Sequence, residues 1–293
     1  MPVRDSLSNA PVLECVMLLC FIRPDTGHRR KTRIMAGDST QNRDGQAGQT
    51  VKGCWAASLG DCEGKISREH LVSQALFPGG NITVSGLRWC KDGSKTVGLA
   101  ALTGKILCQK HNSELSELDT TVKRAFEAFD ESMQLFQLRS KLQGRRWTIK
   151  TFTIDGVLLE RWFLKTLINL NHEGPWIIGE GSHPPGLPND ELVRIAFGKA
   201  MFREKAGLYT AAHDGEQVTL RQGLRLTPKT RGDNLLAGMF SLCGYRFFLS
   251  LVQDEFKEHQ GSHLMYRDVH HWYAPRDDKG RPVRSHRLDI TWQ

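Results

Sequence analysis

Apolar residues recur every three or four positions between residues 115 and 136, which is the period of one face of an α-helix. The apolar positions are Leu115, Leu118, Val122, Ala125, Phe126, Phe129, Met133 and Phe136. This stripe predicts one long helix that packs along a core and ends near Gly144. Asp119, near the start of the helix, is expected to complement the helix dipole.

Shorter patterns predict the elements around this helix. After a turn cluster at residues 77–80, residues 81–89 alternate like a strand, and residues 97–107 alternate loosely up to Cys108. Helices are expected over residues 157–170 and 190–202. The other strand-like segments are 146–154, 208–212, 218–226, 236–242, 246–252, 264–273 and 287–292. The predicted fold class is therefore α+β, with a mainly antiparallel sheet in the second half of the chain.

The chain of 293 residues is long enough for two modest domains of roughly 100 to 200 residues each. Residues 28–53 mix basic, Gly, Gln and Asp residues without periodicity. We therefore expect residues 1–50 to form a flexible leader, within which Met35 is an alternative start. Residues 51–144, including the long helix, are predicted to form the first domain, and residues 145–293 an α+β domain of unknown role.

Composition narrows the class of protein. Hydrophobic residues make up 39% of the chain and charged residues 25%, which argues against a collagen-like, coiled-coil or wholly disordered chain. Lysine and arginine total 40 against 32 acidic residues, a formal net charge of +8. This excess favours a polyanionic partner such as nucleic acid, although charge alone does not decide the function.

The cysteines and the N-terminal apolar run bear on the compartment. Seven scattered cysteines are an odd number and too few for a disulfide framework in a chain of this length, so a reducing, cytoplasmic location is expected. The apolar run from Val12 to Ile22 is interrupted by Glu14 and is too short to span a bilayer. No small-residue cleavage site follows it, so neither a signal peptide nor a membrane segment is expected.

Two pairs of potential zinc ligands stand out from this background. Cys54 and Cys62 have seven residues between them, and Cys108 and His111 have the C-x-x-H spacing directly after a strand-like run. Structural zinc takes four thiolate or imidazole ligands in a tetrahedron, which these two pairs could supply. Cys90 is an alternative to Cys62, and a set of buried reduced thiols beside a surface histidine is the alternative to a metal site.

Between and after these pairs the chain reads ISREHLV at residues 66–72 and ILCQKHNSELSELD at residues 106–119. With the Cys pair upstream, these motifs resemble the HNH endonucleases, whose fold is a ββα-metal unit with zinc knuckles. The resemblance covers about residues 54–130, less than a third of the chain. It implies hydrolysis of phosphodiester bonds in nucleic acid, with structural Zn²⁺, a catalytic divalent ion such as Mg²⁺ and no small-molecule cofactor. DNA is the favoured substrate, and the sequence leaves the choice between DNA and RNA open.

The resemblance also implies roles for three residues. Glu69 and Asn112 correspond to ligands of the catalytic ion, and His70 corresponds to the general base. Physical chemistry is consistent with these roles, because a neutral imidazole can accept a proton from water and a hard cation binds carboxylate and amide oxygens. Adjacent strand residues point to opposite faces, so Glu69 and His70 can share one site only if the backbone there bends or bulges.

Basic residues near these motifs are candidates for phosphate contacts. Arg68 and Lys110 flank the predicted catalytic residues. Arg276, Arg281 and Arg284 follow the aromatic and histidine residues of segment 270–273, a composition typical of phosphate contact combined with base stacking. An ordinary solvated surface is an equal alternative for that stretch.

Two departures from the HNH pattern keep other functions open. Ser73 stands where a proline commonly follows the catalytic histidine, and no asparagine precedes Cys108 in residues 102–107. A zinc-containing module that binds nucleic acid or a protein without catalysis is therefore the alternative function. A third possibility is a structural subunit of a larger complex, whose basic surface contacts an acidic protein. The sequence leaves the oligomeric state open.

Overall fold

The computed structural model of the chain describes most of the sequence after residue 48. The described ranges are 49–90, 93–140, 148–213, 223–253, 262–268, 270–273 and 286–293. Almost all of the predicted leader lies outside them, as do Arg276, Arg281 and Arg284.

The helices all lie before residue 197, and the described elements after it are strands. The helices are α1 (Gln109–Glu114), α2 (Ser116–Ser140), α3 (Gly156–Asn171) and α4 (Asp190–Ala196), with 3-10 turns η1 (Ala57–Leu59), η2 (Gln74–Leu76) and η3 (Leu99–Ala101). The strands are β1 (Ile66–His70), β2 (Asn81–Ser85), β3 (Ser94–Gly98), β4 (Thr103–Cys108), β5 (Lys150–Asp155), β6 (Ile177–Ile178), β7 (Gly207–His213), β8 (Gly223–Arg231), β9 (Asn234–Leu242), β10 (Tyr245–Ser250), β11 (Ser262–Tyr266), β12 (His270–Tyr273) and β13 (His286–Thr291).

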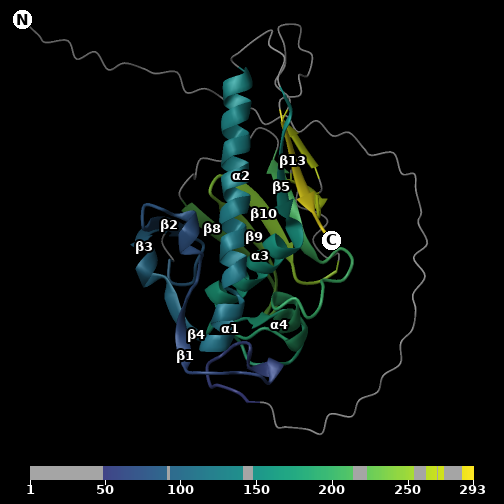
Figure 1. Cartoon of the computed structure of the whole chain (residues 1–293). Coiled ribbons are helices and arrows are strands. Elements are labelled where there is room, and N and C mark those ends of the chain that lie inside the picture. Colours follow the sequence, from purple (N-terminus) through teal and green to yellow (C-terminus); the bar gives the residue numbers. More distant parts are fainter. Residues whose placement is uncertain are drawn as a thin grey trace, which may run out of the picture.

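The predicted long helix is confirmed as α2, which runs through the middle of the molecule in Figure 1. Its stripe residues Leu118, Val122, Phe126 and Phe129 are buried. Leu115 closes the short helix α1 just before α2 begins.

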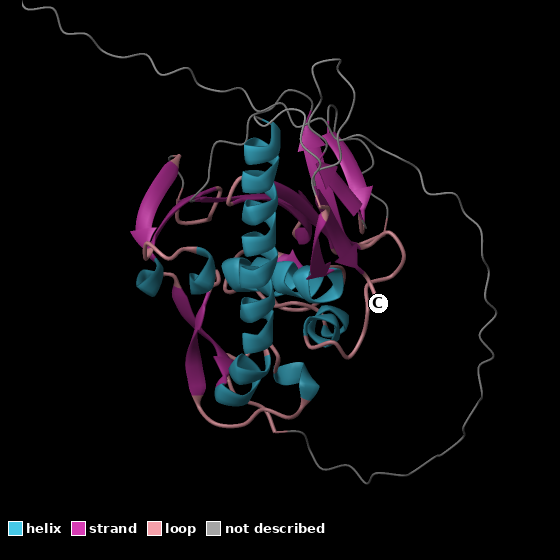
Figure 2. Ribbon diagram, turned by 45° about the horizontal axis from the view of Figure 1, so that its top comes forward, coloured by secondary structure: helices cyan, strands magenta, loops and turns pink. Residues whose placement is uncertain are grey.

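The largest sheet has eight strands and is mainly antiparallel, as predicted. Seven of its strands follow the order β11-β7-β10-β9-β8-β2-β3, and β6 pairs with β9. The pairings β2–β8 and β6–β9 are parallel. A separate three-stranded sheet has the order β12-β13-β5. Strands β1 and β4 form a two-stranded antiparallel sheet of their own, and residues 71–102, with β2 and β3, connect them. We call this pair the β1–β4 hairpin. Figure 2 shows α2 lying across the strands.

The bounds of several predicted elements differ from the structure, and three of these differences have a local cause. The strand expected over residues 97–107 is divided by η3, where Leu99 turns inward and is fully buried. The helix expected to reach residue 202 ends at Ala196, because Gly198 takes a left-handed conformation with φ of 68°. The strand expected over residues 264–273 is divided near Arg267, which has a positive φ.

One aromatic cluster joins both halves of the chain. Phe126 of α2 and Phe163 of α3 both contact Phe247 of β10, at ring-centroid distances of 6.2 and 4.7 Å. The β2–β3 hairpin also joins β8 in the large sheet. The sheet and the core thus extend across the predicted boundary between residues 144 and 145. Among the described helices, none combines the length and apolar character needed to cross a membrane.

Candidate metal centre and its surroundings

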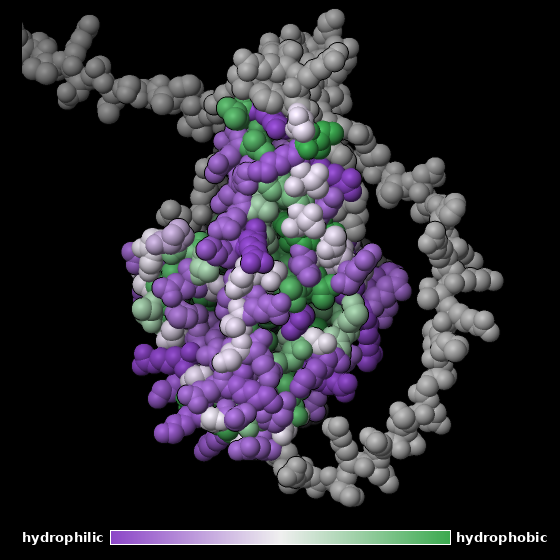
Figure 3. All heavy atoms as spheres, viewed as in Figure 1, coloured by the Kyte–Doolittle hydropathy of each residue, from purple (hydrophilic) through white to green (hydrophobic). Residues whose placement is uncertain are grey.

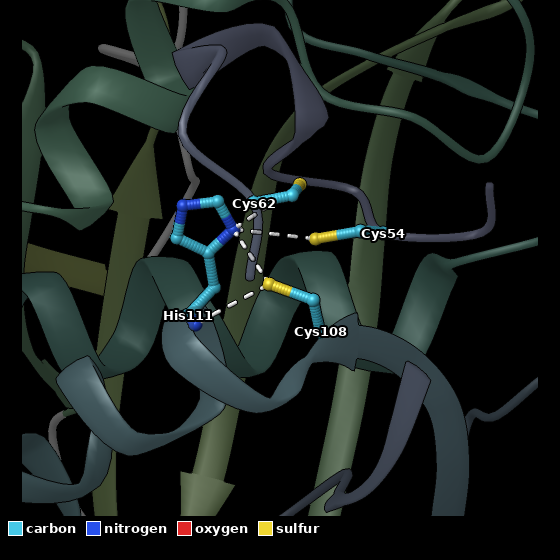
Figure 4. Close-up of side chains that lie close together, drawn as sticks. All are labelled: Cys54, Cys62, Cys108 and His111. Atoms are coloured by element: carbon cyan, nitrogen blue, oxygen red, sulfur yellow. Dashed lines mark hydrogen bonds between the residues drawn. The ribbon is translucent and has the colours of Figure 1, made fainter. Parts of the chain in front are cut away.

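Cys54, Cys62, Cys108 and His111 converge on one point in the structure, as the sequence predicts. Their ligand atoms all lie within 4.8 Å of one another, and all four residues are buried. His111 Nδ1 lies 3.4 Å from Cys54 Sγ, 3.8 Å from Cys62 Sγ and 3.3 Å from Cys108 Sγ. Figure 4 shows the three sulfur atoms grouped around that nitrogen.

These separations fit a tetrahedral metal site. Zn–S bonds of about 2.3 Å and Zn–N bonds of about 2.0–2.1 Å place S and N ligands about 3.6 Å apart in a tetrahedron. Burial raises the pKa of the Cys54 thiol to about 12, so this thiol holds its proton firmly unless a cation replaces it. The cluster could therefore hold a metal ion such as zinc.

Local structure explains how the sequence builds this cluster. Strand β4 ends at Cys108, which caps α1 and accepts a weak hydrogen bond from the backbone N–H of His111. Trp55, next to Cys54, donates its backbone N–H to the Ile106 carbonyl of β4. Cys90 lies elsewhere, with its thiol directed at the carbonyls of Val84 and Gly93, so Cys62 is the fourth member of the cluster.

Asp61 supports the cluster from outside. His111 Nε2 lies 2.9 Å from Asp61 Oδ1, which orients the ring so that Nδ1 faces the sulfur atoms. Metal-binding histidines are commonly oriented in this way by a carboxylate. A hydrogen bond from Lys110 Nζ to Asp61 holds the pKa of the Asp61 carboxyl well below its usual range, so Asp61 stays ionised. The Phe197 ring packs edge-on against His111 with centroids 5.0 Å apart.

The β1–β4 hairpin carries the other predicted site residues. Arg68 pairs with Lys105, Glu69 with Gly104 and His70 with Thr103. The hairpin has a bulge, but it lies before Arg68, and the pairing from Arg68 to His70 is regular. Regular pairing places Glu69 on one face of the hairpin, and Arg68 and His70 on the other.

Glu69 faces inward onto α3. The residue is 5% exposed, and its Oε1 lies 2.6 Å from Lys165 Nζ and 3.5 Å from Asn169 Nδ2. Lys165 Nζ also lies 3.0 Å from Asp119 Oδ2. Burial raises the pKa of the Glu69 carboxyl, and the Lys165 ammonium opposes that rise.

Asn112 attaches α1 to the hairpin beside Glu69. Its Nδ2 donates to Ser67 Oγ at 3.0 Å and to the Arg68 carbonyl at 3.1 Å. The amide of Asn112 thus lies against the strand that carries Glu69 and His70. His70 is the last residue of that strand, and its carbonyl lies 3.4 Å from Asn169 Nδ2.

The sequence analysis did not identify three residues that hold the site residues in place. Asp61, Lys165 and Asn169 contact the site residues directly, and Asp119 binds both Lys165 and Trp162 in addition to its position near a helix start. One signal was available in the sequence, because Lys165 and Asn169 are four residues apart and lie among mostly apolar residues of the predicted helix 157–170. The partners of these residues are over 40 positions away and leave no local pattern.

The candidate phosphate-binding residues differ in their surroundings. Arg68 is exposed on the hairpin. Lys110 is paired with Asp61 at 2.8 Å and with Glu114 at 3.8 Å, so its charge is already balanced. The three arginines between residues 274 and 285 lie outside the described residues.

Comparison of the chain with protein-family models, with curated proteins and with solved structures finds no match. The functional assignment therefore depends on the residues and geometry of this region.

Proposed function

We propose that the chain is a metal-dependent, HNH-like endonuclease that hydrolyses phosphodiester bonds of nucleic acid. One observation carries the proposal. The β1–β4 hairpin is followed directly by α1, the Cys₃His cluster lies at their junction, and Asn112 contacts the strand that bears Glu69 and His70. This order and contact match the ββα arrangement that the HNH resemblance implies.

In this proposal the four-residue cluster binds Zn²⁺ with a structural role. Three thiolates and one imidazole complete a tetrahedron and leave no position for water or substrate. The zinc ion would secure the N-terminus of α1 to the segment 54–62.

The chemistry would belong to the residues of β1 and α1. His70, with an imidazole at the end of β1, would accept the proton of the attacking water. Glu69 and Asn112 would hold a divalent ion, which supplies Lewis acidity toward the phosphate when it is bound. Glu69 Oε1 already faces Lys165, and regular pairing directs Glu69 and His70 to opposite faces of the hairpin. A shared catalytic site therefore requires Glu69 to exchange its partner and the end of β1 to bend, so that both side chains reach one phosphate.

A non-catalytic nucleic-acid-binding module is the second candidate function. The observation that favours it is the burial of Glu69 against Lys165, together with the placement of Glu69 and His70 on opposite faces of the hairpin. In that case Glu69 stabilises the fold, and His70 is one polar group on a binding surface.

Cleavage assays separate the two functions. Purified protein is incubated with supercoiled plasmid, single-stranded DNA or RNA, with Mg²⁺, with Mn²⁺ or with no added divalent ion. We expect metal-dependent cleavage that His70→Ala abolishes and that the control His183→Ala, on the loop between β6 and α4, retains. Undiminished cleavage by folded, zinc-loaded His70→Ala would exclude His70 as the base. Binding without cleavage under every condition would establish the non-catalytic module.

A further inference from the structure

We propose that the open face of the β1–β4 hairpin, with its adjoining loops, is the surface that binds the phosphate backbone of nucleic acid. Arg68 and Lys105 define this surface, which we call the hairpin cation surface, and Lys52 and Lys65 lie in the segments that lead into the hairpin. The inference rests on the proposed function for its choice of partner, and it holds for either the catalytic or the non-catalytic form of that function.

Strand register places two of these cations side by side. Arg68 of β1 and Lys105 of β4 are direct antiparallel partners, so their side chains leave the same face of the hairpin. Both are exposed, whereas Glu69 and Ile106 beside them are buried. The hairpin thus directs its charged positions to solvent and its acidic residue toward α3.

The other two cations come from the segments that enter the hairpin. Lys65 immediately precedes β1, and its carbonyl accepts a hydrogen bond from the Gln109 backbone N–H. Lys52 precedes Gly53, and a Cβ atom added to Gly53 would lie 3.9 Å from the Lys105 carbonyl oxygen. Both lysines are exposed. Three separate chain segments therefore present positive charge on one part of the molecule.

The four cations remain available to a ligand. Within the described ranges, no carboxylate lies within 4 Å of the charged group of any of them, unlike Lys110, which Asp61 and Glu114 neutralise. Figure 3 shows hydrophilic residues over most of the lower part of the molecule, where Figure 1 places the hairpin and α1.

Chemistry favours nucleic acid over an acidic protein as the partner. Protein interfaces usually have a core of large apolar or aromatic side chains, whereas nucleic-acid interfaces are more polar and more positive. The large hydrophobic residues exposed in the described part of the chain are Trp89, Leu138, Ile149 and Met201, and none lies on β1 or β4. His70 shares the open face with Arg68, so a bound backbone would pass beside the proposed base.

The test measures binding without cleavage. Affinity of a fluorescein-labelled DNA duplex and of a labelled single strand is measured by anisotropy across a salt series, with no added divalent ion. The double variant Arg68→Gln/Lys105→Gln is compared with the control Lys95→Gln/Lys123→Gln, which removes equal charge from β3 and α2. Each phosphate contact contributes about −0.9 to the slope of log K against log salt on duplex DNA.

We expect the hairpin variant to reduce the magnitude of that slope by about 2 and the control variant to leave it unchanged. Equal slopes for the hairpin variant and the wild-type protein would contradict the proposed binding surface. In that case, binding or cleavage of nucleic acid by the wild-type protein would still be consistent with the proposed function. Wild-type protein that binds neither labelled probe and cleaves no nucleic acid in the assay above would overturn both.

Discussion

Lys165 is a buried cation that connects the two halves of the chain. Its side chain is about 3% exposed and lies between Glu69 of β1 and Asp119 of α2. Removing charges from water is costly, and a buried ion pair compensates only when its geometry is good. Loss of one partner is therefore more damaging than loss of the pair.

We expect Lys165→Met to destabilise the protein by about 3–5 kcal/mol, because it leaves the Glu69 carboxylate buried without a cation. The double variant Lys165→Met/Glu69→Gln is expected to lose less than the sum of the two single variants, with a coupling of about 0.5–3 kcal/mol. Urea unfolding followed by circular dichroism measures all three. Strict additivity would show that the 2.6 Å contact contributes little.

Asp61 offers a separate test of the metal centre. Asp61→Asn keeps the shape of the side chain but removes the charge next to His111 Nε2. We expect zinc affinity to fall about 10- to 100-fold, as is typical when a carboxylate that orients a metal-binding histidine is changed. Competition with a chromophoric chelator measures the affinity, and Asp190→Asn on α4 is the control. If Asp61→Asn binds zinc as tightly as the wild-type protein does, Asp61 does not contribute to the metal site.

The burial of His286 leads us to expect that the stability of the protein depends on pH. His286 is fully buried with Nε2 2.7 Å from Ser132 Oγ, and burial lowers its pKa to about 4. The unfolded chain, with a histidine pKa near 6.5, binds the proton more readily, so stability is full above that pH and falls toward about pH 4. Between pH 7 and pH 5 we expect a loss of about 2 kcal/mol from this residue. His286→Gln should remove that part of the pH dependence in urea unfolding, and an unchanged dependence would contradict the assignment.

At the scale of elements, the parallel pairing of β2 with β8 brings two distant segments into one sheet. Gly86 follows β2 with φ of 73°, and a Cβ there would meet the Leu226 carbonyl oxygen of β8 at 1.9 Å. Glycine is required at this position both by the left-handed backbone and by the close approach.

Gly86→Ala is therefore expected to destabilise the protein more than Gly80→Ala. Gly80 has a similar φ of 71° but open space around its Cβ position. The control measures the conformational cost alone, about 1–2 kcal/mol, and the difference between the variants measures the contact with β8. Thermal unfolding of both variants makes the comparison, and equal losses would mean that β8 moves aside at little cost.

At the scale of the whole molecule, the Cys₃His cluster lies where the first and second halves of the chain meet. His111 contacts Phe197, which follows α4, and Phe197 also contacts Trp55 at 5.7 Å. A ligand that binds only the folded state stabilises it by mass action. Zinc bound here would therefore stabilise the contact between both halves as well as the hairpin.

We expect native mass spectrometry to detect one zinc ion per chain and chelation to lower the melting temperature of the whole protein in a single transition. Cys108→Ser should reproduce the effect of chelation, whereas Cys90→Ser, outside the cluster, should retain zinc. A protein that melts identically with and without chelator would rule out a structural metal.

Local patterns were sufficient to predict several features of this protein. The apolar stripe of α2, the alternation of most strands and the C-x-x-H spacing at Cys108 are set by neighbouring residues, because helix and strand periods extend over only a few positions. The four-residue metal cluster also followed from the sequence, since thiolate and imidazole ligands limit the possible chemistry.

Other features were decided only by tertiary structure. The pairing of Glu69 with Lys165, the orientation of His111 by Asp61 and the joining of β2 to β8 each link residues 50 to 140 positions apart. The sequence therefore determined which chemical groups the protein has and which local elements carry them. The tertiary structure decided which charges are buried together and which face solvent, because burial and ion pairing depend on how distant elements pack.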